Sequence, residues 1–395
     1  MLGAAPHRLL FFVGATNVLL AMAWWALWLV DARWQLIGLG QPTLPAGWLH
    51  AILMQYLVLP PFIFGFLLTV FPRWMNQPAL ARWHYVPVGV GLLGGQVLTL
   101  AGLLGTPWLL HAGAALTIAG WVFGLGLLLR LLWNESGRTW HAVSCATALT
   151  FGLVGLALYA ASFHFQDARL LFIAIKLGTF GLLVPIFVTV AHRMFPFFAE
   201  FAVPGHAGWR PMSWLAGFWV LAVVHLWFET RHGYAWLWLP DAGLTMLTGM
   251  WLWKNWPRGP MPPLLRVLFA GYLWLPVAMI LFVAQSAWYA ATGNFALGRA
   301  PAHALFIGFF GSLLVAMVTR VTQGHSGRPL VLGWAAGFAF VAIQCVAVMR
   351  ATAELVPDAL AWQALAAFGW LVAFTPWVLH SIRIYLTRRV DGKAG

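Results

Sequence analysis

The sequence predicts an all-α fold: a polytopic transmembrane helix bundle of about 12 spans, with both termini in the cytoplasm. Of the 395 residues, 62% are hydrophobic, and only 8% are Asp, Glu, Lys or Arg, compared with about 25% in soluble domains. The mean hydropathy is +0.84. A soluble core could not bury this much apolar surface, so we expect a single transmembrane domain over residues 1–395.

Twelve apolar segments are each long enough to cross a bilayer, which takes about 20 residues per helix. They lie at residues 9–30, 48–70, 84–104, 108–132, 141–161, 169–192, 212–229, 234–253, 264–291, 302–319, 330–349 and 359–382. The first segment follows a basic start and contains a small-residue "AMA" at 21–23, as a cleavable signal would, but its apolar run continues to Val30. We therefore expect an uncleaved first span.

The basic residues predict the orientation of the chain. The net charge is +13, and of the 22 Lys and Arg residues 16 lie on one side of the predicted topology, five on the other, and Lys176 inside a span. The positive-inside rule places the richer side, with both termini, in the cytoplasm. The basic loops are explained as topology signals and lipid-headgroup partners, and without a nucleic-acid motif we expect no nucleic-acid partner.

Two histidines are the leading candidates for a cofactor site. His50 and His303 each start an apolar helix on the predicted periplasmic side, in "GWLHAILMQY" and "APAHALFIGFF". Two facing helices could supply two axial imidazoles to a haem iron, and Met54, one helical turn after His50, has a thioether suited to copper(I) or a haem edge. His164, in "AASFHFQDAR" on the same side, is a third candidate. A histidine at a span end is also often merely interfacial, so this alternative stays open.

Two further features near these histidines each leave two interpretations open. Gly308, Gly311 and Ser312 follow His303, and such small residues let either a flat macrocycle or a neighbouring helix approach. Lys176 lies about 10 Å into the sixth segment. Its ammonium group could snorkel outward to the interface, or it could hold an anionic group such as a haem propionate.

The stretch RVTQGHSGRPL, residues 320–330, concentrates polar residues in a chain that is otherwise poor in charge. Gly324 and Gly327 let a backbone turn sharply and Pro329 can start a helix, which predicts a tight cytoplasmic turn. His325 follows the histidine of the tenth segment by 22 residues, about 33 Å along a helix, so the two cannot share a metal. The turn is either a structural clamp or part of a second site for an anion or haem propionates. The candidate residues of that second site are Arg320, His325, Arg328, His192 and Arg193.

Three segments resemble the NnrS family of bacterial membrane proteins. Residues 303–330, HALFIGFFGSLLVAMVTRVTQGHSGRPL, are similar to the family's tenth-span pattern, an H-A-L start leading to R-V-x-x-G-H-T-G-R-P-L, with Ser326 in place of the usual Thr. Residues 64–74, FGFLLTVFPRW, resemble a G-F-L-L-T-A block followed by Trp, and residues 192–199, HRMFPFFA, resemble an R-x-I-P-M-F-T ending. The resemblance covers most of the chain in order.

The resemblance implies a haem- and copper-containing protein of nitric oxide metabolism or the nitrosative-stress response, often associated with denitrification. His303 and the loop of His325 match the family pattern directly. His164 corresponds, within a residue or so, to a family histidine near the end of the fifth span. The resemblance therefore implies haem b, with nitric oxide and a quinol or other electron donor as possible partners.

One family motif is only half present. The family's second span opens with H-x-H-E-M, in which His50 takes the place of the first His and Met54 that of the Met. Ile52 and Leu53 replace the second His and the Glu. A metal ligand and a supporting carboxylate are thus missing, so the chain resembles a divergent member in which copper is the weaker expectation.

Three functions remain open from the sequence. The first is a haem-binding protein that handles nitric oxide, the second a transporter or a metal or haem carrier without redox turnover, and the third a quinol-linked electron-transfer protein. Twelve spans fit a carrier, but no acidic residue lies at a predicted mid-span position, where ion-coupled carriers usually keep one. The chain has neither the adjacent His-His pair of haem–copper oxidases nor the C-x-x-C-H motif of c-type haem. No catalytic residue can be named, so enzymatic activity also stays open.

Overall fold

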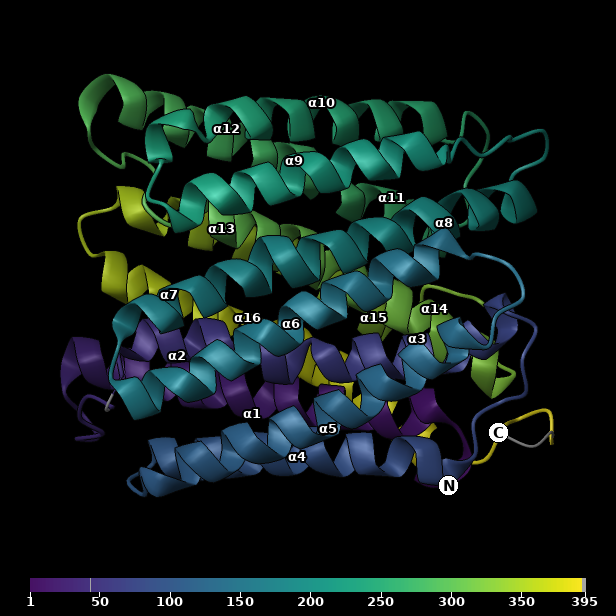
Figure 1. Ribbon diagram of the computed structural model, residues 1–395, viewed down its shortest axis with the longest axis horizontal. Coiled ribbons are helices and arrows are strands. Elements are labelled where there is room, and N and C mark those ends of the chain that lie inside the picture. The colour runs from purple at the N-terminus through teal and green to yellow at the C-terminus, as the bar shows by residue number, and fades with distance from the viewer. Residues whose placement is uncertain (43, 393–395) are drawn as a thin grey trace. The chain divides into compact units, whose positions relative to one another are not determined.

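The computed structural model describes residues 1–42 and 44–392, and all regular secondary structure within these residues is helical (Figure 1). The prediction of an all-α polytopic bundle is confirmed. Among the described residues, eleven helices are long and apolar enough to cross a membrane. Their bounds are Pro6–Trp34, Ala46–Trp74, Arg82–Leu103, Trp108–Trp133, Trp140–Phe165, Ala168–Ala202, Met212–Thr230, Pro263–Thr292, Ala300–Ser326, Trp334–Leu355 and Ala359–Leu386.

One predicted span differs in character from the others. The segment predicted at 234–253 corresponds to helix α10 (Trp238–Asn255), which is regular but is not among the eleven. It is less apolar than they are, because its 18 residues include Asp241, Lys254 and Asn255. The described chain therefore holds eleven strongly apolar spans and one more polar helix of membrane-spanning length.

The predicted turn at residues 320–330 is shorter than expected. Helix α14 (Ser312–Ser326) continues through Gly324, and of the two glycines only Gly327 takes a left-handed backbone, with φ of 72°. The next helix, α15 (Trp334–Thr352), starts four residues later than predicted. The helix extends into this polar stretch because several polar side chains of its last two turns are buried rather than exposed to water.

Contacts divide the chain into two compact units. Unit 1 comprises Met1–Leu183, Thr322–Pro329 and Val378–Gly395, and unit 2 comprises Val184–Val321 and Leu330–Trp377. Three of the four boundaries fall inside continuous helices. No linker therefore sets off a soluble part from the spans.

Unit 1 is built on closely packed helices. They are α1 (Pro6–Trp34), α2 (Ala46–Ile52), α3 (Pro60–Trp74), α4 (Arg82–Leu103), α5 (Trp108–Trp133), α6 (Trp140–Phe165) and α7 (Ala168–Lys176). Helices α4 and α5 lie side by side (Figure 1), because glycines let their backbones approach: a Cβ at Gly91 would lie 2.5 Å from the Cα of Gly120. The buried indole of Trp121 in α5 donates a 3.0 Å hydrogen bond to the Leu149 carbonyl in α6. This bond ties the next helix to the pair.

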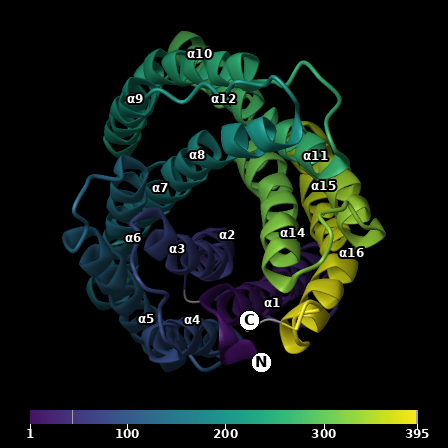
Figure 2. The same cartoon turned by 90° about the vertical axis from the view of Figure 1, so that its right-hand side faces the viewer.

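Side-chain hydrogen bonds, one of them from an indole, link helices within unit 2. It contains α8 (Val184–Ala202), α9 (Met212–Thr230), α10, α11 (Pro263–Tyr272), α12 (Trp274–Thr292), α13 (Ala300–His303), α15 and most of α14 and α16 (Ala359–Leu386). Helix α10 lies beside α9 and α12 (Figure 2). Trp274 of α12 donates to Gln344 of α15 at 2.6 Å, and Gln344 donates to Ser312 of α14 at 2.8 Å. This chain of side-chain bonds connects three helices without an unsatisfied polar group between them.

Candidate cofactor site

π-helical turns interrupt three spans in the described part of the chain. They are η2 (Leu53–Val58), η3 (Leu177–Leu183) and η5 (Ala304–Gly311). Each follows a residue predicted to bind a cofactor: His50 lies three residues before η2, and Lys176 and His303 directly precede η3 and η5. Such turns are rare and occur frequently at functional sites. Sequence pattern alone did not reveal them.

In unit 1, η2 and η3 pack against each other through buried polar groups. Gln55 Nε2 donates to Thr179 Oγ1 at 2.9 Å, and the Tyr56 hydroxyl donates to a carbonyl of α7 at 2.6 Å. Asn17 of α1 donates to the Leu57 carbonyl at 2.7 Å. Because a π-helical turn displaces carbonyls from the regular pattern, these side chains supply partners that the helices themselves do not.

His50 is held by aromatic stacking. Its ring lies on that of Trp25 with centroids 4.4 Å apart and planes 11° apart, and Trp25 stacks in turn on Trp28 at 5.2 Å. Met54, at the start of η2, is buried at 8% exposure. The stacking fixes the plane of the imidazole, and a ligand held in a fixed orientation binds a metal with little loss of side-chain entropy.

The other two predicted residues of unit 1 lie against rings of their own helices. His164, in the last turn of α6, packs edge-on against Phe165 at 4.9 Å. The ammonium of Lys176 lies 5.2 Å from the ring centroid of Phe172, one turn nearer the start of α7. This cation–π contact directs the lysine towards the predicted periplasmic end, as snorkelling requires.

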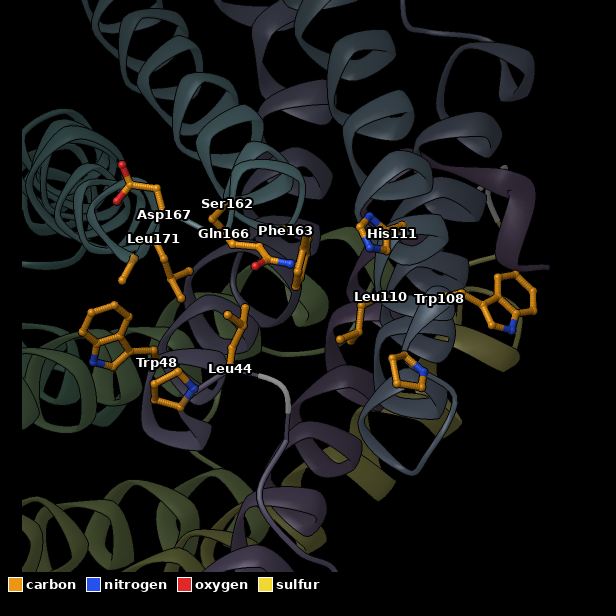
Figure 3. A pocket seen from close by; sticks show the side chains of 13 residues that line it. Leu44, Trp48, Trp108, Leu110, His111, Ser162, Phe163, Gln166, Asp167 and Leu171 are labelled. Carbon is orange, nitrogen blue, oxygen red and sulfur yellow. The ribbon is translucent and has the colours of Figure 1, made fainter.

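A pocket of about 630 Å³ opens in unit 1 near these residues (Figure 3). Its walls come from α2, α5, α6, α7 and the loop before α2, and they are mostly apolar and aromatic. His111 of α5 lines it, with its ring 5.1 Å from that of Phe163, and Trp48 lies two residues before His50. The volume is within the range of about 300–1,000 Å³ for small-molecule and cofactor sites. Sequence analysis did not select His111.

The pocket suits the apolar part of a cofactor better than its charged part. Asp167 lines the pocket, and hydrogen bonds from Arg169 hold the pKa of this carboxyl below its ordinary value. Arg169 is already paired with it, at 2.9 Å. The Asp167–Arg169 pair therefore brings no net charge to the pocket, and the mostly apolar and aromatic walls suit an apolar ligand.

In unit 2, His303 is oriented by its own helix. Its Nδ1 lies 2.9 Å from the carbonyl oxygen of Arg299. A carbonyl can only accept, so Nδ1 carries the proton and Nε2 has the lone pair, which is the arrangement common for metal-binding histidines. His50 belongs to unit 1 and His303 to unit 2, so their shared ligation of one iron stays a prediction.

The small residues after His303 are explained by helix packing. A Cβ at Gly308 would overlap the ring of Trp274, and one at Gly311 would lie 3.3 Å from Ile343. Ser312 accepts a hydrogen bond from Gln344. Of the two interpretations of these residues, close approach of a neighbouring helix is the one that the contacts support.

The residues predicted for the second site divide between the units. Arg320, His192 and Arg193 belong to unit 2, where the Arg320 guanidinium lies 3.9 Å from the ring centroid of Phe198 and His192 stacks on an indole at 5.2 Å. His325 and Arg328 belong to unit 1, together with other basic residues that sequence analysis did not associate with them. The grouping of all five into one site stays a prediction.

Unit 2 contains a buried ionisable group of three that sequence analysis missed. His225 Nδ1 lies 2.5 Å from Asp241 Oδ1, and its Nε2 lies 3.3 Å from Glu229 Oε2. His225 and Asp241 are fully buried. The i, i+4 spacing in "HLWFE" could have signalled one contact, but the other joins α9 to α10. Carboxylates that looked interfacial are thus buried, which weakens the sequence argument against a carrier.

Comparisons with known proteins agree with this architecture. A family model described as NnrS protein matches residues 1–389. No curated protein matches the chain. The match covers nearly the whole chain, including the spans that contain all three π-helices of the described residues. The chain is therefore a multi-pass helical membrane protein that belongs to the NnrS family.

Proposed function

We propose that the protein binds haem b near the predicted periplasmic ends of its spans and handles nitric oxide there. The observation that carries this proposal is the position of the π-helices, because η3 and η5 directly follow Lys176 and His303, and η2 begins three residues after His50. Residues that were selected from the sequence for their chemistry thus lie beside π-helical turns, which the selection did not use. Membership in the NnrS family supports the link to nitric oxide.

The residues present fit haem in three respects. The His50 ring is stacked in a fixed plane, the His303 ring is held by the Arg299 carbonyl, and the pocket beside His111 has mostly apolar walls. Bound haem would supply an iron that coordinates nitric oxide. The protein's part is to orient imidazoles and to exclude water. Nitric oxide is small and apolar, so it can reach such a site through the bilayer.

Copper fits less well. Ile52 and Leu53, which stand where the family motif has His and Glu, are both buried hydrocarbons at 0% and 1% exposure. Neither can ligate a metal. Among the described residues, no group of three or more His, Cys, Asp or Glu side chains could hold a metal ion. We therefore propose haem as the principal cofactor.

A carrier is the second candidate function, and the specific observation in its favour is the buried group of His225, Glu229 and Asp241. Ionisable groups buried in spans commonly mark proton or substrate paths. Electron transfer from quinol would also use haem. The spectra described next separate these functions, because a carrier of this kind needs no resident haem.

The test is a set of reduced-minus-oxidised visible spectra of the detergent-purified protein with metal analysis. We expect b-type haem bands that shift on addition of nitric oxide, and altered spectra in His50→Ala and His303→Ala. His380→Ala, an exposed histidine on the predicted cytoplasmic side, is the matched control and leaves the spectrum unchanged. Haem bands that do not shift on addition of nitric oxide favour electron transfer. If the spectra of His50→Ala and His303→Ala are both the same as the wild-type spectrum, the ligand assignment is refuted.

A further inference from the structure

Unit 1 gathers basic residues from four separate parts of the chain. We define the basic cluster as His7 and Arg8 from the first turn of α1, Arg73 from the end of α3, His325 and Arg328 around the end of α14, and Arg389 after α16. The rings of His7 and His325 are 4.5 Å apart. Arg73 and Arg389 both lie close enough to act electrostatically on these two rings.

Arg8 is the centre of this cluster and is almost completely buried, at 3% exposure. Its Nη1 donates to the Thr387 carbonyl at 2.9 Å. Its Nη2 is buried and has no hydrogen-bond partner among the residues that the structure describes, and the same holds for Nη1 of Arg328. Leaving a buried charged donor unpaired is strongly unfavourable, so both groups call for an acceptor.

The charges around Arg8 have one sign. Two arginines, Arg328 and Arg389, lie close enough to Arg8 to repel its charge. Among the described residues, Asp391 supplies a carboxylate to this cluster, and it accepts two hydrogen bonds of 2.5 and 2.8 Å from Arg389. This pairing raises the pKa of Arg389 above its ordinary value. The carboxylate thus stabilises Arg389 and leaves Arg8 and Arg328 without a counter-charge in the described chain.

The backbone around the cluster is firmly held. Arg389 donates to the His325 carbonyl at 2.8 Å, and the Val390 N–H donates to the Ser326 carbonyl at 3.2 Å. Gly327 has positive φ, and a Cβ there would lie 2.7 Å from Asp391 Cγ. The turn after α14 is therefore clamped by the C-terminal segment. The clamp holds the arginines in place before any ligand arrives, which lowers the entropy cost of binding.

We propose that the basic cluster is a binding site for a phosphate group. Guanidinium groups that converge from separate segments match the oxygens of a tetrahedral phosphate and can each donate two hydrogen bonds. The first turn of α1 adds the positive end of its helix. The phosphate is that of an anionic lipid headgroup or of a small soluble phosphate. The site does not depend on the proposed haem.

The experiment uses the full-length protein, delipidated in detergent, with two probes. Inorganic phosphate is titrated by calorimetry, and retention of phosphatidylglycerol, with phosphatidylcholine as the neutral comparison, is measured by native mass spectrometry. Each probe is applied to wild type, Arg8→Gln, Arg328→Gln and Arg138→Gln. Arg138 is the matched control because it is an exposed arginine on the same predicted side, stacked on Trp140 and outside the cluster.

We expect roughly tenfold or greater loss of binding in Arg8→Gln and Arg328→Gln, and none in Arg138→Gln. Loss confined to phosphatidylglycerol identifies the lipid as the source, and loss confined to inorganic phosphate identifies a soluble ligand. Arg328 is half-buried, so its variant tests the site even if Arg8→Gln does not fold. Failure of wild type to bind either probe, or equal binding by all variants, overturns the proposal. Haem spectra of the same samples stay unchanged, which separates this site from the haem proposal.

Discussion

At the scale of single residues, histidines that occupy similar positions in their spans have different surroundings. His303 was selected because it starts an apolar helix, and it proves to be oriented by the Arg299 carbonyl. His225 was not selected from the sequence, yet it is fully buried between two carboxylates. Sequence position shows how far along a span a residue lies. It does not show which helix faces it, and burial depends on that.

Gly308 offers a test of packing at this scale. Gly308→Ala places a methyl group in the ring of Trp274 and disturbs the indole bond to Gln344, so we expect a loss of about 1–3 kcal/mol in the free energy of unfolding. Thermal unfolding in detergent measures it. Gly249→Ala in α10, where nothing lies within 4 Å, is the control and should be near neutral or slightly stabilising. Unchanged stability together with an altered haem spectrum in Gly308→Ala would instead favour a macrocycle beside this glycine.

At the scale of elements, span positions followed from hydropathy, but irregular backbone did not. The segment predicted at 169–192 is the span Ala168–Ala202. The sequence of its π-helical turn η3, "LGTFGLL", is an apolar run with no pattern that predicts such a turn. A π-helical turn amounts to one extra residue in a helix. Whether that residue is tolerated depends on partners from other helices, such as Asn17 for the Leu57 carbonyl, and these partners are distant in sequence.

Asn17 tests how η2 is maintained. Asn17→Ala removes the donor to the Leu57 carbonyl inside unit 1, and a buried unsatisfied acceptor costs about 1–3 kcal/mol, so the melting temperature should fall. Thr150→Val is the control, since the exposed Thr150 bonds only a carbonyl of its own helix, and it should change stability by less than about 0.5 kcal/mol. An equal effect in both variants would show that η2 does not depend on Asn17.

At the scale of the whole molecule, the contacts between chain ends bear on the number of spans. Arg8, in the first turn of α1, hydrogen-bonds the carbonyl of Thr387, just after α16. Both ends of the described chain therefore meet in unit 1, and a chain that returns to its starting side crosses a membrane an even number of times. We infer that α10 crosses as the twelfth span despite its polar residues. Its Asp241 is buried against His225 of α9 rather than exposed to lipid.

Reporter fusions test this topology. Green fluorescent protein fused after Gly392 should fluoresce, because we expect that end in the cytoplasm, and alkaline phosphatase fused after Gln166 should be active outside the inner membrane. If α10 does not cross, the number of spans is odd and the Gly392 fusion is dark. Expression of each fusion is checked by immunoblot, so that a dark fusion is not mistaken for an absent one.

The proposed function of this NnrS-family protein depends on haem bound through histidines beside its π-helices. The most direct measurement is the haem content per polypeptide of protein purified from haem-replete cells, by the pyridine haemochrome method. We expect close to a whole-number ratio of b-type haem in wild type and in His380→Ala, and a clear loss in the His50→Ala/His303→Ala double variant. Folded wild-type protein without haem would contradict the claim, as would a double variant that retains the wild-type haem content.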